Sequence, residues 1–358
     1  MTDSPAGTVA APLPRPTGLR WYWLVAALAV LLAALIGALV TGAADLAPVG
    51  VVAALLDRLP FVALDSGLNP VQTSVLFELR LPRVLLAAVV GGSLAIAGAS
   101  YQGVFRNPLA DPYLLGAAAG AGLGATIVIT YASDFAIGGF NAVPAAAFVG
   151  ALCGVGLAYG LGATAGRAGG TATLLLAGVA VASFLTAVQT FVLQSRSESL
   201  QRVYAWILGQ LGTAGWRELG LVLPYVLVST GTLLLHGRLL DVLAVGDDEA
   251  ASLGLRARRV RLTVLVAASL ATASAVAVSG LIGFVGIVVP HIVRRLTAGS
   301  YRVVLPLSLL GGAAFLVLAD VVARTVIAPA ELSIGVITAF VGSPFFAALL
   351  WLSRRTIT

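Results

Sequence analysis

Apolar segments of about 20 residues, the length that a helix needs to cross a bilayer, recur along this chain from residue 21 to residue 352. Of its 358 residues, 59% are hydrophobic and 10% are charged, whereas soluble domains carry about 25% charged residues. So few charges cannot cover a water-facing surface, and most of the surrounding solvent must be lipid. We expect an all-α, polytopic membrane protein, and a soluble fold is excluded.

The apolar segments predict about ten transmembrane helices. The expected spans are residues 21–42, 83–104, 114–132, 142–162, 172–194, 218–236, 259–279, 281–297, 303–323 and 333–352. The boundaries are least distinct around residues 280 and 330, where Gly-Leu-Ile-Gly and Ala-Pro-Ala-Glu interrupt the hydrophobicity, so eight or nine spans are an alternative. Residues 21–352 are expected to form the membrane domain, between a disordered cytoplasmic tail at 1–20 and a short cytoplasmic tail at 353–358. The run at 21–42 exceeds the roughly 7–15 residues of a signal-peptide core, and we expect it to be retained as the first span.

The basic residues are all arginine, and their distribution predicts the orientation of the chain. With the N-terminus inside, 14 of the 21 fall in or beside inside segments, which fits the excess of positive charge in cytoplasmic loops. The seven expected outside are Arg58, Arg80, Arg83, Arg196, Arg202, Arg217 and Arg324. We therefore expect a multi-pass protein of the cell (inner) membrane with both termini in the cytoplasm. The net charge of +6 resides in these short clusters, which does not indicate nucleic-acid binding.

Several kinds of chemistry are excluded by residue types that the sequence lacks or scarcely contains. The absence of lysine removes the lysine of a phosphate-binding P-loop and a Schiff-base lysine. One cysteine, Cys153, and two histidines, His236 and His291, form no zinc-binding pattern. An ATPase site within the chain is therefore not expected, nor is a bound cofactor or metal. Two other functions remain as alternatives, an intramembrane enzyme and an ion-coupled secondary transporter. The first would need a catalytic motif within the bilayer and the second a carboxylate at its midplane, and the sequence shows neither.

Two places interrupt the helical pattern with irregular backbone. Pro108 and Pro112 cannot continue a helix, so residues 107–111 must be non-helical at the end of a span. The second place is the glycine-rich stretch 279–286, followed by Pro290 within a span. Discontinuous helices mark transport pathways, although an ordinary loop would explain the first interruption equally well. The glycine pairs spaced by four, Gly116/Gly120/Gly124, Gly150/Gly154 and Gly156/Gly160, predict close helix packing.

The inside segment 237–258 differs from every other loop because acids precede arginines along it. Residues 244–253 are compatible with a short helix that has acids at its N-terminal end and Gly254 after its C-terminal end. Such a helix on the cytoplasmic side would dock a soluble partner, and a solvated loop is the alternative. Near the outer side, Asp320 precedes Arg324 by four residues, the favoured spacing for an ion pair on one helix.

The ordered motifs resemble the permease subunits of the FecCD type, from ABC importers of iron-siderophores, haem and cobalamin. The resemblance covers about residues 21–352. It is carried by Arg80-Leu-Pro-Arg83, Gln102 with Arg106-Asn-Pro-Leu-Ala-Asp-Pro112, Leu174-Leu-Leu-Ala-Gly-Val179, Ser279-Gly-Leu-Ile-Gly-Phe-Val-Gly286, Pro290-His291 with Arg294, and Ala319-Asp-Val-Val-Ala-Arg324. It implies a ten-helix subunit that pairs with a second copy or a close paralogue. It also implies two separate ATP-binding subunits, which carry ATP-Mg, and an extracytoplasmic substrate-binding protein.

The resemblance further implies roles for individual residues. Arg80, Arg83 and Arg324 match outward-facing arginines that meet acids on the binding protein. Gln102, Asn107 and Leu109 match the translocation path and its cytoplasmic gate, and Thr171 and Ala172 align more loosely with a second constriction. The ATPase-coupling segment would contain Gly246, Asp247, Asp248, Glu249, Ala250, Ser252, Leu253 and Gly254.

The cargo expected from the resemblance is a bulky metal chelate. An apolar path with few charged groups does not suit a bare metal ion, which needs carboxylate, imidazole or thiolate ligands. Iron-siderophore is the first candidate, with haem and cobalamin next.

Overall fold

The computed structural model of the chain describes residues 19–354, except for residues 43, 61–62, 133–135, 138–139, 165–170, 213–214 and 298. Most of the two expected tails, at 1–20 and 353–358, therefore lies outside the described residues.

The described chain is almost entirely helical. Its helices are α1 (Trp21–Val40), α2 (Pro48–Asp57), α3 (Pro70–Ser74), the π-helix η1 (Val75–Arg80), α4 (Leu81–Phe105), the 3-10 helix η2 (Pro112–Leu115), α5 (Ala117–Tyr131), α6 (Ala142–Thr164), α7 (Thr171–Ser195), the 3-10 helix η3 (Ser197–Ser199), α8 (Leu200–Ile207), α9 (Trp216–Leu235), α10 (Gly237–Val245), α11 (Asp247–Ser252), α12 (Ala257–Ser279), α13 (Val285–Leu296), α14 (Tyr301–Thr325) and α15 (Ile334–Arg354). Two short strands, β1 (Ala136–Ile137) and β2 (Phe140–Asn141), pair antiparallel between α5 and α6. The prediction of an all-α protein is confirmed.

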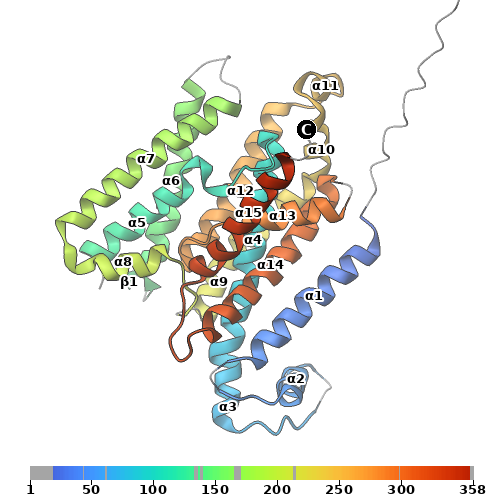
Figure 1. Cartoon of the computed structure of the whole chain (residues 1–358), viewed down its shortest axis with the longest axis vertical. Helices are drawn as coiled ribbons and strands as arrows, with labels where there is room; N and C mark the ends of the chain where they lie inside the picture. The colour runs from blue at the N-terminus through green and yellow to red at the C-terminus, as the bar shows by residue number, and fades with distance from the viewer. Residues whose placement is uncertain are drawn as a thin grey trace, which may run out of the picture.

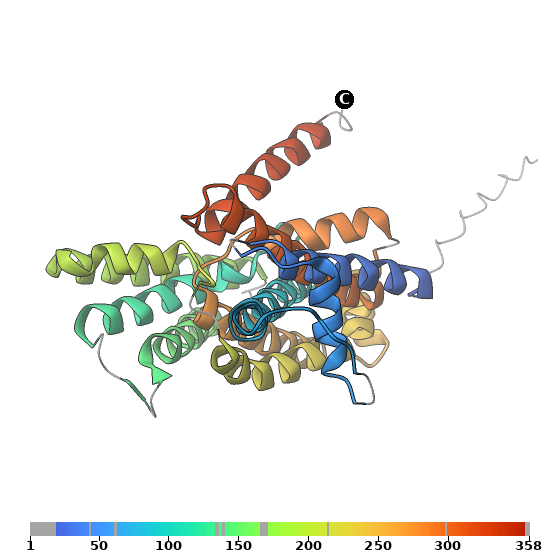
Figure 2. The ribbon, with the colours of Figure 1, turned by 90° about the horizontal axis from the view of Figure 1, so that it is seen from below.

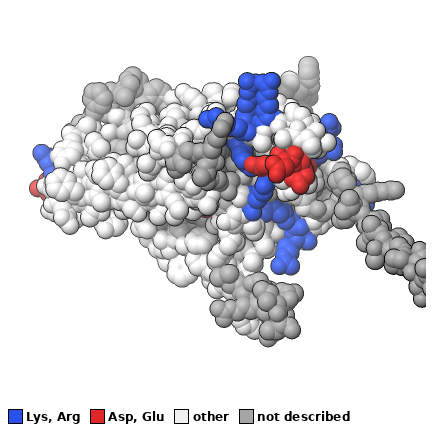
Figure 3. All heavy atoms as spheres, turned by 90° about the horizontal axis from the view of Figure 1, so that it is seen from above, with Lys and Arg blue, Asp and Glu red and all other residues white. Residues whose placement is uncertain are grey.

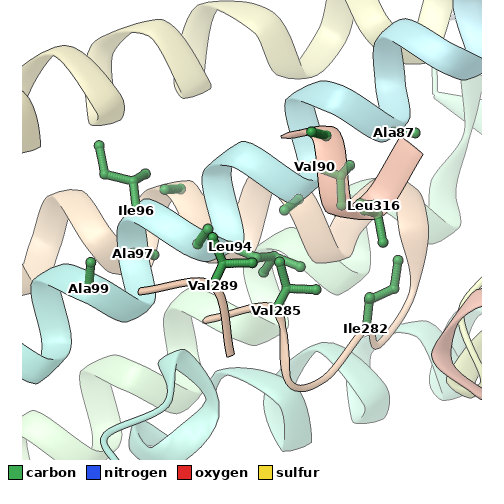
Figure 4. Close-up of a cluster of buried hydrophobic side chains, with 14 of the residues drawn as sticks. Ala87, Val90, Leu94, Ile96, Ala97, Ala99, Ile282, Val285, Val289 and Leu316 are labelled. Carbon is green, nitrogen blue, oxygen red and sulfur yellow. The ribbon is translucent and has the colours of Figure 1, made fainter. Parts of the chain in front are cut away.

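Helix α4 lies at the centre of the molecule (Figure 1). Of its 25 residues, 20 are buried, as expected of a helix that is apolar around its whole circumference. Its glycines allow close neighbours, because a Cβ at Gly91 would overlap the carbonyl oxygen of Gly312 on α14. Figure 4 shows side chains of α4, α13 and α14, among them Leu94, Val289 and Leu316, gathered in one apolar core.

Helices α5, α6 and α7 pack together as a second group beside this core (Figure 1). A Cβ at Gly120 of α5 would overlap the carbonyl oxygen of Gly150 on α6, and a Cβ at Gly154 of α6 would overlap the carbonyl oxygen of Gly116. The predicted glycine packing is thus confirmed for these helices. It is wrong for the pair Gly156/Gly160, where an added Cβ would meet no atom within 4 Å.

A helix coincides with each of the ten expected spans. Among the described residues, seven helices are long and apolar enough to cross a membrane, counting residues 70–105 as one. The remaining expected spans correspond to α5, α13 and α15, and of these α5 and α13 have only 15 and 12 residues. Each of these two helices follows a segment that is not α-helical: η2 precedes α5, and residues 280–284 precede α13. The two helices are therefore shorter than the apolar runs that contain them.

The two ends of the bundle differ in character. Helices α10 and α11 lie at one end with the C-terminal end of α15, and α2 and α3 lie at the other (Figure 1). We call these the α11 end and the α2 end. Helix α15 stands away from the rest of the bundle, on the side opposite α9 (Figure 2). The distribution of arginines predicts that residues 237–258 and the C-terminus lie on one side of the membrane. The position of α10, α11 and the C-terminal end of α15 at one end of the bundle is compatible with that prediction.

Candidate functional site

The turn after α4 is rigid although it is not helical. Arg106 ends α4 in a left-handed conformation with φ 49°, and the following residues are tied by their own hydrogen bonds. The side-chain oxygen of Asn107 accepts the backbone N–H of Leu109 at 2.9 Å, and the backbone oxygen of Asn107 accepts the N–H of Ala110 at 3.1 Å. Leu109 is 39% exposed. The predicted non-helical turn is therefore confirmed, with an apolar side chain presented at its tip.

Gln102 holds this turn from within the bundle. Its side-chain nitrogen donates to the backbone oxygen of Ala110 at 3.3 Å and to that of Gly286 at 3.0 Å. Its side-chain oxygen accepts a hydrogen bond from Arg294. Gln102 is 1% exposed, so in this conformation it braces the turn against α13 and presents no group to an open path.

The second predicted interruption, residues 280–284 between α12 and α13, packs against the first. The hydroxyl of Tyr113 donates to the backbone oxygen of Ile282 at 3.0 Å and accepts the N–H of the same residue at 3.1 Å. Gly280 and Phe284 both adopt positive φ, 69° and 67°. Irregular backbone inside a membrane domain is tolerated only where protein or a water-filled cavity satisfies it. Here the Tyr113 hydroxyl, just after the first irregular segment, provides a hydrogen-bond partner for both backbone groups of Ile282 in the second.

Thr171 and Ala172, the looser candidates for a second constriction, open α7. Ala172 is exposed, and the side chain of Thr171 lies outside the described part. None of the hydrogen bonds and ion pairs found within the described ranges joins Ala172 to the turn after α4.

The expected helix at 244–253 is in fact the end of one helix and the whole of another. Gly246 is extended (φ 169°, ψ 161°) and separates α10 from α11. The predicted start is therefore wrong, because the chain must leave the direction of α10 before the acids can occupy the first turn of a new helix. The predicted end is confirmed: Gly254 adopts φ 77°, and the N–H of Leu255 closes the helix on the oxygen of Ala250 at 2.9 Å.

Helix α11 presents both charged and apolar groups to the surroundings. Asp247, Asp248 and Glu249 lie in its first turn, where the helix dipole favours acids. Leu253 is 74% exposed, whereas Ala250 is fully buried beneath the helix. Figure 3 shows acidic atoms gathered in one patch with arginine atoms around it, at the α11 end.

Asp247 is the most strongly held of these acids. Its carboxylate pairs with Arg106, at the end of α4, and with Arg261 on α12. The hydrogen bond from Arg261 lowers the pKa of Asp247 from its ordinary value, and the charge of Arg106 lowers it further. The sequence did not single out Arg106 for this position, because 141 residues separate the two partners along the chain.

At the α2 end, Arg80 does not face outward as predicted. It is 6% exposed, and its guanidinium donates to the backbone oxygens of Leu39, at 2.7 Å, and Val40, at 2.9 Å, and to that of Ala44. The first two are carbonyls at the end of α1, which has no further helical turn to satisfy them. The expectation of an outward-facing charge is therefore wrong at this position: Arg80 stabilises the end of α1.

Arg83 and Arg324 also turn toward the protein. Arg83 donates to the carboxylate of Asp320 from two nitrogens, at 3.0 and 2.9 Å, and to both oxygens of Glu331 at 2.9 Å. Arg324 lies 3.0 Å from the other oxygen of Asp320, which confirms the expected pairing of these two residues. The side chains of Arg83 and Arg324 are 13% and 8% exposed. The outward orientation predicted for them is thus not found in this conformation, and Glu331 is an exposed partner that the sequence analysis missed.

Within the described ranges, no group of three or more His, Cys, Asp or Glu side chains is placed to hold a metal ion.

The chain matches the family model of the FecCD transport family over residues 21–352. It is 42% identical over 287 residues to a cobalamin import system permease protein of Halobacterium salinarum, which covers 80% of this chain and 76% of that one. It is 39% identical over 298 residues to a hemin transport system permease protein of Yersinia pestis, with 81% and 86% covered. A solved structure of a metal-chelate type ABC transporter in an inward-facing conformation superposes with a TM-score of 0.79 at 28% identity, covering 92% of this chain and 98% of that one.

The relatives are permease subunits of ABC transporters, in which separate subunits hydrolyse ATP. The family model covers all of the helices from α1 to α14 and most of α15. It therefore includes the two irregular segments, at residues 107–111 and 280–284, and the acidic helix α11. This chain belongs to the FecCD transport family.

Proposed function

We propose that this chain is the permease subunit of a binding-protein-dependent ABC importer that carries a metal chelate across the cell membrane. Two copies, or one copy and a close paralogue, would enclose the path, and two copies of a separate ATPase would drive it. The observation that carries the proposal is the position of α11: in a FecCD chain, an exposed acidic helix lies directly beside the turn that ends α4.

Helix α11 is the proposed contact with the ATPase. It is short, exposed on the side away from Ala250, and ends in an exposed apolar side chain at Leu253. A soluble partner can therefore bury Leu253 while it meets Asp248 and Glu249 with basic groups. The proposal also places the α11 end and both termini in the cytoplasm, which accords with the arginine distribution.

The turn after α4 is the proposed cytoplasmic gate. A second copy related by a twofold axis would present the same turn to this one, so two Leu109 side chains would close the path with apolar groups. Gln102 would then act by bracing the turn, and Thr171 and Ala172 would contribute a second constriction only when two copies are together.

The α2 end is the proposed docking surface for the binding protein. Because the guanidinium of Arg80 is hydrogen-bonded to the end of α1, we propose that Arg80 stabilises this surface and does not contact the binding protein itself. Arg83 can be reached from outside where it meets Glu331, whose side chain is 45% exposed. An acid on the binding protein would compete with Glu331 for Arg83, with Arg324 holding Asp320 in place behind it.

The proposed cargo is an iron-siderophore first, with haem and cobalamin as the next candidates. The permeases that resemble this chain are named for cobalamin, hemin, iron-citrate and iron-hydroxamate, which are all pre-formed chelates. The single cysteine and the two histidines of the sequence likewise suit a chelate better than a bare ion, because thiolate and imidazole ligands are scarce.

Affinity purification from native membranes tests the proposal. A tagged copy of this chain should retain an ATP-binding subunit, in a ratio of one to one if two copies of the chain pair and of two to one if one copy pairs with a paralogue. The binding protein recovered with it should then bind a ferric siderophore in preference to haem or cobalamin in a titration of the three. A tagged chain that retains no ATP-binding subunit would contradict the function, and preference for haem or cobalamin would change only the cargo.

A further inference from the structure

Arg106 occupies a position where helices commonly end on glycine. A left-handed residue after the last helical turn carries no Cβ strain when it is glycine. In the described chain only Arg106 and Phe284 adopt positive φ without being glycine. The long side chain of Arg106 is thus retained at a position that a smaller residue would occupy more easily, and its contacts indicate why.

The side chain of Arg106 joins α4 to the α10–α11 segment. Its Nε donates to the backbone oxygen of Leu243, near the end of α10, at 2.7 Å, and Nη2 pairs with the carboxylate of Asp247, the first residue of α11. The two contacts flank Gly246, where the direction of the chain changes. Arg106, at the start of the turn after α4, therefore contacts both α10 and α11 and stabilises the change of direction between them.

The other partner of Asp247, Arg261, approaches from α12. The side chains of Arg106, Arg261 and Asp247 are 37%, 24% and 48% exposed, so none of them is locked in the core. The carboxylate meets both arginines at once, so a displacement of α11 away from α4 would break the pair with Arg106 while the pair with Arg261 is kept. A two-state element of this kind is what energetic coupling between distant sites requires.

Arg106 and Leu109 belong to one hydrogen-bonded turn, so a displacement of the Arg106 backbone would be carried to Leu109. The N–H groups of Arg106 and Asn107 remain bonded to the last turn of α4, at Gly103 (3.4 Å) and Gln102 (3.2 Å), and Asn107 then fixes Leu109. Two residues, Asn107 and Pro108, separate Arg106 from the exposed apolar side chain of Leu109. By contrast, α10 is clamped elsewhere, because Asp241 accepts hydrogen bonds from Ser300 and from the N–H of Tyr301 at the start of α14.

We propose that the Arg106–Asp247 ion pair is the link through which movement of α11 reaches the turn at Leu109, with Arg261 as the alternative partner of Asp247. This inference rests on the proposed function, since it assumes that an ATPase moves α11 and that the turn is the gate. It assigns Arg106 as a positioning residue that transmits movement and contacts neither cargo nor nucleotide.

The test measures the turn directly and needs no cargo. A Leu109→Cys reporter in a Cys153→Ser background is purified with its ATPase in lipid nanodiscs. The rate at which a membrane-impermeant maleimide labels the introduced thiol is then compared with and without ATP, and ATP hydrolysis is measured in parallel. With Arg106 intact, we expect ATP to change the labelling rate. In Arg106→Gln the ATP-dependent change should shrink by roughly 2- to 30-fold, the range of coupling mutations, while hydrolysis continues.

Further variants separate the link from general damage. Asp247→Asn should reduce the response at least as much as Arg106→Gln, because it removes the pairs with both Arg106 and Arg261. The double variant should be no worse than Asp247→Asn alone, since the Arg106 pair is already lost there. Arg238→Gln, which removes an exposed arginine from α10, should leave the response unchanged. If Arg106→Gln is not recovered as a folded protein in the membrane, Asp247→Asn carries the test, because it leaves the left-handed residue Arg106 in place.

The outcomes distinguish the link from the proposed function. A reporter complex that retains no ATPase, or shows no ATP-dependent labelling with Arg106 intact, would overturn the proposed function and the link with it. A full ATP response in Arg106→Gln would overturn the link alone. Loss of the ATPase from Arg106→Gln would also overturn it, since Arg261 still holds Asp247 there and docking should persist.

Discussion

Asp320 is the residue on which the α2 end of the bundle depends most. Its carboxylate is fully buried and meets both Arg83 and Arg324. Removing one member of a buried ion pair leaves the other charge without compensation, at a cost of about 3–5 kcal/mol. We therefore expect Asp320→Asn to lower the free energy of unfolding by about that amount, measured by denaturant titration in detergent micelles. The exposed Asp65→Asn should change it by less than about 0.5 kcal/mol, and equal effects of the two variants would show that the pair is not structural.

Glu331 competes with an incoming acid for Arg83, if the α2 end docks the binding protein as proposed. Glu331→Gln removes the competing charge, so association of the binding protein should strengthen by about two- to fivefold, the energy of an exposed ion pair. Surface plasmon resonance at low salt measures this, and the gain should diminish at high salt because exposed charges are screened. Glu198→Gln, an exposed glutamate outside this pair, is the control. Unchanged or weaker association in Glu331→Gln would remove Arg83 from the docking surface.

The charge of Asp247 should persist over the physiological pH range. The hydrogen bond from Arg261 lowers its pKa from the ordinary value of 3.8. A carboxyl with a lowered pKa contributes stability above its unfolded pKa and loses it only as the pH falls through the lower, folded value. Retention of the ATPase by α11 should therefore be constant between about pH 5 and pH 8, as measured by pull-down at several pH values. If retention falls toward pH 5 in the wild type and not in Asp247→Asn, this carboxylate titrates in the range and the assignment is incorrect.

At the scale of single residues, the sequence predicted which residues gather and not where they point. Arg80, Arg83 and Arg324 do lie at one end of the bundle, as the orientation argument required. Their partners could not be foreseen, since Arg80 binds carbonyls at the end of α1 and Arg83 binds Asp320 and Glu331, which lie 237 and 248 residues further along the chain. Only the Asp320–Arg324 pair was predictable, because both residues lie one turn apart on one helix.

Among the elements, the turn after α4 is the proposed gate, and Leu109 is its exposed tip. Leu109→Ala shortens the side chain without touching the hydrogen bonds of Asn107, so folding and dimerisation should be preserved. Because both copies lose the apolar group at once, the closed path should leak. We expect ATP-independent efflux of a loaded ferric siderophore from proteoliposomes to rise at least about threefold, equivalent to at least about 0.65 kcal/mol of gate stability. Leu28→Ala, at an exposed leucine of α1, controls for general loss of apolar side chains, and wild-type efflux in Leu109→Ala would make the turn an ordinary loop.

Helix α11 should be required for contact with the ATPase and dispensable for folding. The N–H of Leu253 donates to the oxygen of Glu249 at 3.2 Å, and proline at 253 removes this donor and crowds the preceding turn. Leu253→Pro should therefore give a membrane-inserted protein that retains at most about a tenth of the ATPase in pull-down, a loss of about 1.4 kcal/mol. Leu253→Ala, which keeps the N–H, should lose less. Full retention in Leu253→Pro would move the coupling surface away from α11.

The existence of each element followed from the sequence better than its limits did. Proline at 108 and 112 was sufficient to predict the turn, because it acts locally on the backbone. The division between α10 and α11 at Gly246 was missed, since it depends on how α10 is held by Asp241 against α14. Likewise, α13 is shorter than its apolar run because the 280–284 segment bonds to Tyr113, a contact between distant parts of the chain.

For the whole molecule, composition and periodicity predicted the class of protein and the places of its helices, because the bilayer imposes both. The family followed from motifs in a fixed order, and the match over residues 21–352 confirms it. What one copy of the chain does not contain, within its described residues, is a closed path: Leu109 is exposed and α15 stands apart from the bundle. In the proposed transporter, a second copy or a close paralogue, the ATPase and the binding protein join this chain.

Uptake by reconstituted proteoliposomes distinguishes an ATP-driven importer of chelates from a secondary transporter. The chain is reconstituted with its ATPase, and uptake of ferric siderophore, haem and cobalamin is measured with the binding protein outside and ATP inside. We predict uptake of one of these chelates only when ATP and the binding protein are both present, with no uptake of free metal ions. Uptake that persists without the ATPase and follows an imposed proton or sodium gradient would contradict this prediction, because the chain would then be a secondary transporter.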